Sequence, residues 1–365
     1  MDHIPVLIAG GGPAGAATAL SLAARKIPCI IAEASPSPQD KAGETIPANA
    51  APLLRKLGIM GLLEEPAHLP CYGNRFIWGR EQPADKLYFF HIHQQGWHLD
   101  RRIFEQQLQA KVTATGTRYL NGWRVTHCNP DDGQWTVSLK NDNNDTRMIS
   151  CDFIADATGK SCRIARMLGS TRHHADKLVG ISTCYQLTGV LPQYTFIEAV
   201  QHGWWYAALL SGQRLMTTFM TDADLLGPEV RHPQGYLDSL RQTGLIAPLL
   251  SNVNVCTESE PSVFTAASGY LSACYGQRWL AVGDAAFSYD PISSYGITSA
   301  LEGGFYAGHA IADTLAGNRD ALPAYDWLIT QAFTRYTTMH QHQYQQEQRW
   351  PQQPFWQRRH SLIPA

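Results

Sequence analysis

IPVLIAGGGPAGAATALSLAARK, residues 4–26, is the stretch of sequence that decides the fold. Residues 4–9 are an apolar run typical of a buried strand, and a loop with four glycines, residues 10–15, follows it directly. Residues 13–26 are rich in alanine and leucine, which favours a helix. A strand, a glycine loop and a helix in this order predict a turn that binds a dinucleotide.

The loop residues have separate roles in such a turn. Gly10 permits the tight turn, Gly12 lets the backbone approach a pyrophosphate, and Gly15 lets the helix pack close to the strand. Pro13 and Ala14 open the helix, whose N-terminus would then meet the phosphates. A glycine-rich turn without a ligand is the alternative for the loop taken alone.

A second apolar strand, residues 28–32, follows the helix and leads into Glu33 and Ala34. An acid at this spacing is placed to bind the ribose hydroxyls of an adenosine. Strand, loop, helix, strand and acid follow one another within 33 residues. This order favours a bound dinucleotide over an empty turn.

A glycine and an acid also follow a later apolar strand. Residues 279–282 are this strand, and Gly283 and Asp284 come next. The loop and the helix opening after them carry Pro291, Ser294, Gly296 and Ile297. This pattern resembles the second FAD fingerprint of aromatic hydroxylases of the p-hydroxybenzoate hydroxylase type. The resemblance implies that Asp284 binds a ribityl hydroxyl and that the helix start faces the flavin pyrimidine edge, where its dipole would stabilise an anionic reduced flavin.

A third segment lies between these two. Residues 156–161 read Asp-Ala-Thr-Gly-Lys-Ser and include Thr158 and Gly159. They resemble the middle motif of the same family, with its Asp-Gly pair split by two residues, as in the tryptophan halogenase branch. Arg101 matches the family arginine near the FAD. The resemblance implies non-covalent FAD as cofactor, with NAD(P)H as a transient reductant because no second glycine fingerprint is present.

The implied fold class is α/β, with a Rossmann-like FAD-binding domain of the p-hydroxybenzoate hydroxylase type, an inserted antiparallel-sheet substrate domain and a C-terminal helix. The FAD-binding domain would be discontinuous, over residues 1–70, 96–170 and 270–320. The substrate domain would take residues 71–95 and 171–269. Residues 321–365 would form the C-terminal helix and tail.

The middle of the chain has the pattern of antiparallel strands. Apolar and polar residues partly alternate over 180–187 and 195–200, which predicts two strands. A turn at 211–213 between two apolar stretches, 204–210 and 214–220, predicts a hairpin.

The C-terminal region has apolar residues at helical spacing from Leu322 to Trp350, and Pro351 would stop this helix. The tail beyond Pro351 is either a disordered end or a docking segment. Asp290, just ahead of the presumed flavin loop, is placed to cap a turn.

The composition excludes several classes of protein. The 365 residues carry a formal net charge of −2 without a basic stripe, which argues against nucleic-acid binding. No run of 18 apolar residues could span a membrane and no signal peptide precedes the first strand, so we expect a cytoplasmic protein. The eight cysteines have no zinc-like spacing, so no metal site is expected.

Two further strings resemble the flavin-dependent tryptophan halogenases. Residues 43–47, Gly-Glu-Thr-Ile-Pro, are similar to their Gly-Glu-x-x-x-Pro segment, and residues 203–206, Gly-Trp-Trp-Tyr, lie where they carry Trp-x-Trp-x-Ile-Pro. Halogenases also need a lysine before a Phe-x-x-Trp-like stretch and a glutamate in the flavin loop. This chain has no lysine in residues 71–78, and Ser293 takes the place of the glutamate. The resemblance therefore implies the halogenase frame without halogenation.

The same strings, together with residues 283–296, most resemble the flavoproteins that mature cysteine tryptophylquinone amine oxidases, the LodB/GoxB type. These hydroxylate a tryptophan inside a precursor polypeptide, and the resemblance covers most of the chain. It implies a flavin-dependent monooxygenase that uses NAD(P)H and O₂, with a quinoprotein amine oxidase precursor as its partner. An NAD(P)H-dependent hydroxylase of a free small aromatic compound, a flavin-dependent halogenase and a non-catalytic binding protein on the same frame stay open.

The candidate catalytic residues are Glu44, Trp204 and Tyr206. Glu44 and Thr45 are also candidate flavin contacts, and a helix cap is the alternative for Glu44. Trp204 and Tyr206 share one face of a predicted strand, so plain core packing is their alternative.

An aromatic stretch, residues 71–98, contains His91, His93 and His98, for which hydrogen-bonded structure is the alternative to a catalytic base. Only 16% of all residues are charged. This low charge, the aromatic stretch and the Phe355-Trp356 end together predict a surface that docks a protein substrate beside an open flavin pocket.

Overall fold

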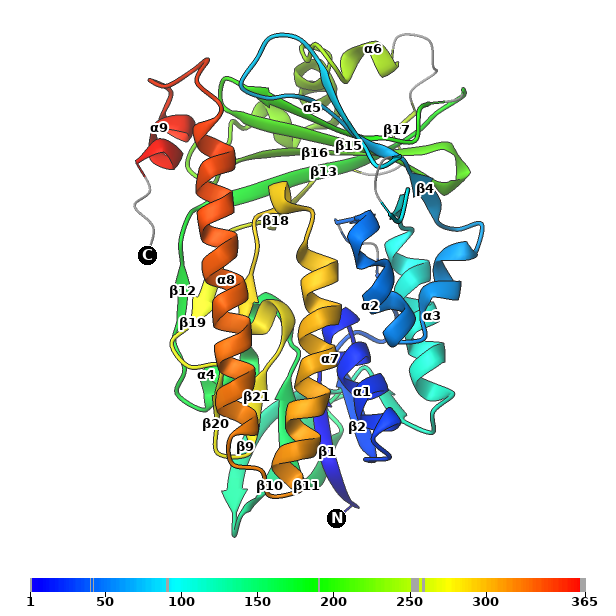
Figure 1. Cartoon of the computed structure of the whole chain (residues 1–365), viewed down its shortest axis with the longest axis vertical. Helices are drawn as coiled ribbons and strands as arrows, with labels where there is room; N and C mark the ends of the chain where they lie inside the picture. The colour runs from blue at the N-terminus through cyan, green and yellow to red at the C-terminus, as the bar shows by residue number, and fades with distance from the viewer. Residues whose placement is uncertain are drawn as a thin grey trace.

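The computed structural model describes residues 2–39, 41, 43–89, 92–189, 191–250, 256–257 and 260–361. The α-helices in these ranges are α1 (Pro13–Ala24), α2 (Ala51–Lys56), α3 (Arg101–Thr113), α4 (Arg163–Met167), α5 (Pro233–Leu240), α6 (Ala247–Leu250), α7 (Gly296–Leu315), α8 (Ala321–Gln345) and α9 (Pro354–His360). Two larger sheets lie at opposite ends of the molecule, and α7 and α8 run between them (Figure 1).

The first sheet has a parallel centre. Its strands β21 (Trp279–Ala281), β11 (Thr146–Asp156), β1 (Asp2–Ala9), β2 (Cys29–Glu33) and β8 (Arg118–Asn121) lie in this order and run parallel. At its margins, β20 (Tyr275–Gly276), β10 (Gln134–Lys140) and β9 (Arg124–Asp131) pair antiparallel. Val6 to Ala9 are all buried in the centre, which explains the continuous apolar run of β1.

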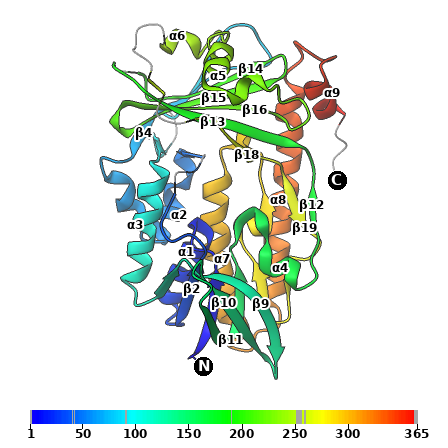
Figure 2. The ribbon, with the colours of Figure 1, turned by 180° about the vertical axis from the view of Figure 1, so that it is seen from behind.

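Helices α1 and α7 pack closely against each other beside this sheet. A Cβ atom at Gly304 of α7 would lie 2.5 Å from the carbonyl oxygen of Ala14, and one at Gly308 would lie 2.4 Å from Cβ of Ser21. The glycines of α7 therefore allow its backbone to approach α1. As a result, the start of α1 lies beside Gly304, two turns into α7, and the first turns of α7 continue beyond α1 toward the second sheet (Figure 2).

The second sheet lies across the other end of the molecule, and we call it the roof. Its strand order is β17 (Cys256–Thr257), β13 (Leu178–Gln186), β16 (Arg214–Asp222), β15 (Gly203–Leu210), β14 (Thr195–Val200), β5 (Gly73–Ile77) and β6 (Ala84–Leu87), with β18 (Ser262–Thr265) also paired to β13. Trp205 faces α5, where its ring meets Tyr236 at 5.1 Å. Trp204 and Tyr206 lie on the opposite face, toward α8 and the first sheet.

Two small sheets connect the first sheet and the roof. One consists of β3 (Thr45–Ile46), β7 (Gly96–His98) and β4 (Leu69–Cys71), and the other of β12 (Arg172–His174), β19 (Gly269–Leu271) and β22 (Phe287–Ser288). In the first of them Thr45 and Leu69 both pair with His98. This pairing brings residues far apart in the sequence to the region between the first sheet and the roof.

The structure confirms the expected α/β class, the strands of the middle region and the hairpin of β15 and β16. Two helices end earlier than the sequence pattern predicts. α1 ends at Ala24, because Lys26 adopts a left-handed conformation with φ of 59°, and α8 ends at Gln345. The division of the chain into an FAD-binding domain, a substrate domain and a tail stays a prediction.

The predicted docking surface at Phe355 and Trp356 is wrong. Both side chains are fully buried in the short helix α9, and the Trp356 indole donates to the carbonyl oxygen of Val200 at 3.0 Å. The segment folds back because these rings complete an aromatic cluster with Trp78 and Tyr344. Within the described part of the chain, none of the helices combines the length and apolarity that crossing a bilayer requires.

The aromatic stretch 71–98 divides into buried and exposed side chains. Trp78, Tyr88 and Trp97 are buried, whereas Tyr72 is 46% and Phe89 is 70% exposed. Phe90 and His91 lie outside the described residues. A docking role for the exposed members stays a prediction.

Candidate functional site

The three predicted dinucleotide motifs meet at one place. Gly10 has a φ of +103°, and a Cβ atom on it would lie 2.2 Å from the carbonyl oxygen of Ala157. A Cβ atom on Gly283 would lie 2.7 Å from Cβ of Ala14. The glycine loop therefore touches both the middle motif and the turn at Asp284, and only glycine permits this close approach.

The glycine loop leaves one side open at the start of α1. A Cβ atom on Gly15 would lie 2.0 Å from the carbonyl oxygen of Gly10, so the first helical turn packs tightly against the loop. By contrast, a Cβ atom on Gly12 would meet no atom of the described residues within 4 Å. Gly12 is the N-cap of α1, and Pro13 and Ala14 begin the helix. Free space beside a helix N-terminus suits a pyrophosphate.

Glu33 lies at the end of β2 beside this loop. Its carboxylate accepts hydrogen bonds from the backbone N–H of Gly11 at 2.7 Å and of Ser35 at 2.8 Å. The Tyr119 hydroxyl donates to the carbonyl oxygen of Gly11. These residues line a small surface pocket at the position predicted for the adenosine. Ala34 is exposed next to it.

The middle motif is organised by Asp156. Its buried carboxylate accepts from the Thr158 hydroxyl at 2.6 Å, the Thr158 N–H at 3.0 Å and the Ala165 N–H at 2.8 Å. Gly159 follows in a left-handed conformation with φ of +64°. The Thr158 side chain is thus engaged in its own turn, which leaves the backbone of the motif to face a cofactor.

Asp284 lies among three cationic side chains. Burial raises the pKa of its carboxyl group, and the charges of Lys160, Arg172 and Arg101 oppose that rise. Arg172 also donates to the carbonyl oxygen of Asp284 at 3.0 Å. Arg101 donates to the carbonyl oxygen of Gly43 at 2.8 Å, which connects this region to the segment that carries Glu44.

The loop that leads into α7, residues 290–295, is called the entry loop below. It contains a single 3-10 turn, Pro291–Ser293, and Ser294 is left-handed with φ of 49°. Gly296 and the buried Ile297 begin α7. The buried hydroxyl of Thr298, in the first turn of α7, has no hydrogen-bond partner among the described residues.

Glu44 lies between the dinucleotide motifs and the roof. It is 2% exposed, and its Oε1 atom is buried without a hydrogen-bond partner in the described ranges. Burial raises the pKa of its carboxyl group, against the opposing effects of Arg101 and His98. The Tyr206 hydroxyl, from roof strand β15, is 2.8 Å from Oγ1 of Thr45. The structure thus brings Glu44, Thr45 and Tyr206 together.

A thiol and an imidazole lie behind Glu44. His98 is fully buried, with Nε2 2.9 Å from the Thr195 hydroxyl and Nδ1 3.1 Å from the carbonyl oxygen of Leu209. Burial raises the pKa of the Cys71 thiol, but the charge and hydrogen bond of His98 outweigh burial and lower it to about 7. Sequence reasoning missed Cys71 and Thr195, because neither belongs to a motif. His93 lies in the turn before β7 and is partly buried.

Trp204 belongs to the buried aromatic cluster. Its ring lies 6.4 Å from that of Trp78, and its indole N–H donates to the Tyr344 hydroxyl at 3.0 Å. The one polar atom of this side chain therefore already has a partner. This contact favours packing over chemistry for Trp204.

The arrangement fits FAD. The open side of Gly12 suits a pyrophosphate, Glu33 suits a ribose, and the buried oxygens of Glu44 and Thr298, without a partner among the described residues, would be available to polar atoms of a flavin. As for metals, the described residues contain no group of three His, Cys, Asp or Glu side chains that could bind one.

Comparisons with known proteins agree with this geometry. Over its whole length the chain is similar to an FAD-dependent oxidoreductase, LodB of Marinomonas mediterranea, with 29% identity covering 99% of this chain and 98% of that protein. The solved chondrochloren halogenase CndH, an FAD-dependent halogenase, has the same fold with a TM-score of 0.91 and 18% identity, covering 100% of this chain and 87% of CndH. The peptidyl tryptophan dihydroxylase QhpG, described as essential for tryptophylquinone cofactor biogenesis, aligns with a TM-score of 0.78 and 24% identity, covering 98% and 78% of the two chains.

The family model of the tryptophan halogenases matches residues 71–364. That range includes the roof, the entry loop and both C-terminal helices. The chain therefore belongs to the tryptophan halogenase family, and it is an FAD-dependent oxidoreductase of that family.

Proposed function

We propose that this protein is an FAD-dependent monooxygenase that hydroxylates a tryptophan side chain in a precursor polypeptide during tryptophylquinone biogenesis. The full-length similarity to LodB and the fold shared with a peptidyl tryptophan dihydroxylase support this proposal. The reductant would be NAD(P)H and the second substrate O₂. The partner would be the precursor of a quinoprotein amine oxidase.

The observation that carries the proposal is the buried Glu44 carboxyl group beneath the roof, with one oxygen atom unpartnered among the described residues. Residues 71–78 hold no lysine, and Arg75 in that stretch pairs with Asp85 at 2.7 Å. Ser293, at the position of the halogenase glutamate, donates to the carbonyl oxygen of Asp290 at 2.8 Å. The site thus offers a proton acceptor and lacks the two side chains expected for handling hypohalous acid.

The chemistry assigned to these residues is proton transfer and positioning. FAD, when bound, supplies the activation of O₂. The aromatic ring gains one oxygen atom at carbon and loses the proton from that carbon, the second oxygen atom leaves as water, and NAD(P)H is oxidised to NAD(P)⁺. Glu44 would accept the ring proton, and Tyr206 with Thr45 would hold the ring beneath the roof.

Halogenation is the second candidate, because the family model is that of halogenases. One experiment separates the candidates. The protein is incubated with NAD(P)H or reduced flavin, O₂ and chloride. The substrate is either free tryptophan or an unmodified quinoprotein precursor. The masses of the products are measured by mass spectrometry. The proposal expects a gain of about 16 Da per inserted oxygen on the precursor. A chlorinated product, or faster hydroxylation of free tryptophan with no gain on the precursor, would contradict it.

Glu44→Gln tests the assigned base. The amide has the same shape but cannot take a proton, so hydroxylation should slow by about 10²- to 10⁴-fold while FAD stays bound. Because burial raises the pKa of Glu44, the wild-type rate should fall with acidification at a pH above the ordinary carboxyl range, and this limb should disappear in Glu44→Gln. Glu64→Gln, at an exposed position, is the matched control.

A further inference from the structure

The entry loop has little regular structure of its own. Apart from its 3-10 turn and the left-handed Ser294, it makes no helix or strand, yet it leads directly into α7 and its unpartnered Thr298 hydroxyl. A loop of this kind keeps one conformation only if other groups hold it. The groups that do so are gathered around Asp290.

Asp290 is 1% exposed, and each of its carboxylate oxygens is bonded. Oδ1 accepts from the N–H of Ile292 at 2.8 Å, which confirms the predicted turn cap. Oδ2 accepts from the Tyr344 hydroxyl at 2.8 Å and contacts Nε2 of His340 at 3.0 Å. Burial raises the pKa of this carboxyl group, but the hydrogen bond and charge of His340 outweigh burial and hold it below the usual value.

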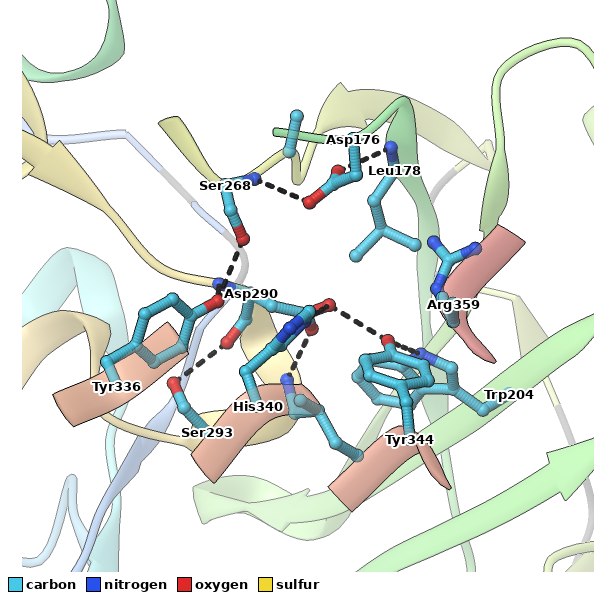
Figure 3. A network of polar contacts seen from close by, with 12 residues as sticks. Asp176, Leu178, Trp204, Ser268, Asp290, Ser293, Tyr336, His340, Tyr344 and Arg359 are labelled. Carbon is cyan, nitrogen blue, oxygen red and sulfur yellow. Dashed lines mark hydrogen bonds and ion pairs between the residues drawn. The ribbon is translucent and has the colours of Figure 1, made fainter. Parts of the chain in front are cut away.

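The partners from α8 share one face of that helix. Tyr336, His340 and Tyr344 are spaced by four residues, so their side chains stack along the helix. The Tyr336 hydroxyl accepts from the backbone N–H of Asp290 at 2.8 Å and also contacts the Ser268 hydroxyl at 2.8 Å. Figure 3 shows all three side chains directed at Asp290. One helix face therefore binds both the backbone and the carboxylate of the entry loop.

The same helix face also reaches the roof. The Tyr344 hydroxyl that donates to Asp290 accepts from the indole N–H of Trp204 on β15, the strand that carries Tyr206. The Arg359 guanidinium lies over the Tyr344 ring at 5.1 Å and pairs with Asp222 at 2.9 Å. A continuous buried chain of hydrogen bonds thus runs from Trp204 through Tyr344 to Asp290 (Figure 3).

We propose that the Trp204–Tyr344–Asp290 chain, braced by His340 and Tyr336, is a positioning device that fixes the roof strand β15 relative to the entry loop and the start of α7. Trp204 is then a positioning residue, because it acts through Tyr344, and Tyr206 two residues further on shares the strand it anchors. This chain of hydrogen bonds would set the distance between the roof and a bound flavin. The inference rests on FAD binding and not on the identity of the substrate.

The test measures bound FAD in the absence of any substrate. Asp290→Asn leaves one side-chain oxygen, which cannot accept from Ile292 and from His340 and Tyr344 together, and removes the charge that faces His340, so the dissociation constant of FAD should rise about tenfold, or about 1.4 kcal/mol. The visible absorption band of the bound flavin should also change, because the entry loop shifts. A merely structural role would lower the melting temperature and leave the flavin band unchanged.

If Asp290→Asn does not fold, two substitutions of His340 provide the test instead. His340 is 10% exposed and Asp290 is 1% exposed, so a substitution at His340 should disturb the fold less than one at Asp290. His340→Asn removes the donor to Asp290 and should reproduce the change in affinity and absorption, whereas His340→Gln restores a donor near the Nε2 position and should reverse most of it. His342→Asn, at an exposed position on the same helix, is the control.

Folded His340→Asn protein with wild-type FAD affinity and an unchanged flavin band would overturn the positioning role. So would equal effects of the asparagine and glutamine variants. Neither outcome depends on hydroxylation of a precursor, so a failure of this inference is distinguishable from a failure of the proposed function.

Discussion

The glycine loop and the entry loop both lead into helices that pack against each other, but they are held in different ways. The glycine loop is fixed by its own neighbourhood: Gly10 N–H donates to the carbonyl oxygen of Ala32, and Gly11 N–H donates to Glu33. The entry loop is fixed by side chains of α8, whose contacts with Asp290 span 46 to 54 positions in the sequence. The backbone N–H groups of Gly10 and Gly11 are thus bonded within residues 4–33, with further contacts to the loop from Tyr119 and Ala157, whereas the entry loop is held by a distant helix.

Because the two loops are held differently, they contribute differently to the cofactor site. A local loop can form wherever its strand and helix form, so it binds the part of the cofactor that is common to many flavoproteins. A loop held by a distant helix takes its position from everything that positions that helix. Here these are the roof, through Trp204, and helix α9, through Arg359.

The largest effect is expected for Arg359→Met, which removes the contact between helix α9 and Asp222 of roof strand β16. The buried guanidinium pairs with Asp222, and its loss should lower the free energy of unfolding by about 4 kcal/mol, because the buried carboxylate loses both bonds from Arg359 and keeps the partly exposed Arg358. Arg358→Met removes a neighbouring arginine that binds the same Asp222 from a side chain that is 41% exposed, and it should cost about 1 kcal/mol or less. Urea denaturation of both variants measures the difference. Similar losses would mean that the buried Arg359 contact stabilises the fold no more than the exposed Arg358 contact.

Gly10→Ala attacks the local loop. A Cβ atom at φ of +103° would lie 2.2 Å from the carbonyl oxygen of Ala157, so the variant should lose about 3 kcal/mol of stability and be purified without FAD. Gly122→Ala is the control, since its φ is +78° but a Cβ atom there meets no described atom within 4 Å. The control should lose about 1 kcal/mol and keep its flavin. Full FAD content in Gly10→Ala would break the assignment of the loop.

Asp284→Ala tests the turn at residues 283–284, which lies between the glycine loop and the entry loop in the sequence. If Asp284 bonds a ribityl hydroxyl, as the family resemblance implies, removing its carboxylate should raise the dissociation constant of FAD about thirtyfold, or about 2 kcal/mol. Asp313→Ala, at the exposed far end of α7, should leave the constant unchanged. Fluorescence titration with FAD measures both. Denaturation of the wild-type protein should also release its flavin into the supernatant, whereas flavin retained on the precipitate would contradict non-covalent binding.

The smallest effect is expected for Tyr344→Phe. Asp290 keeps His340 and Ile292 as partners, but the buried indole N–H of Trp204 loses its acceptor, so the variant should lose about 1.5 kcal/mol of stability. A double-mutant cycle with His340→Asn should show coupling of about 0.5 to 1 kcal/mol, because both residues bond the same oxygen atom. Tyr306→Phe, a partly exposed tyrosine on α7, is the control. Additive losses in the cycle would show that the two side chains act independently.

Much of the fold could be predicted from the sequence, for identifiable reasons. Residues 4–33 contain a strand, a loop, a helix and an acid in the order that a dinucleotide-binding turn requires, and the structure has each of these elements in place. The hairpin of β15 and β16 was predicted because its turn joins strands that pair with each other directly. The tail was mispredicted because Phe355 and Trp356 look like an exposed apolar end until the roof that covers them is present.

The candidate site was predicted only in part. Glu44 and Tyr206 were selected from short strings, but their meeting requires a contact between β3 and the roof across 161 positions in the sequence, at Thr45 and Tyr206. Cys71 and Thr195 were missed, since a single thiol and a single threonine carry no spacing signal. The four-residue spacing of Tyr336, His340 and Tyr344 was visible in the sequence. It was not singled out, because such a spacing implies a shared helix face but does not say what that face binds.

By itself the sequence determined the α/β class and the glycine loop, because these depend on periodicity and on the order of strand, glycines and helix, and the resemblance of its motifs to a known family implied FAD. Tertiary structure alone decided the burial of Glu44, the position of the roof and the anchoring of the entry loop. Those features depend on which distant surfaces meet. The Trp204–Tyr344 bond, which spans 140 positions, forms only when the roof and α8 have packed together.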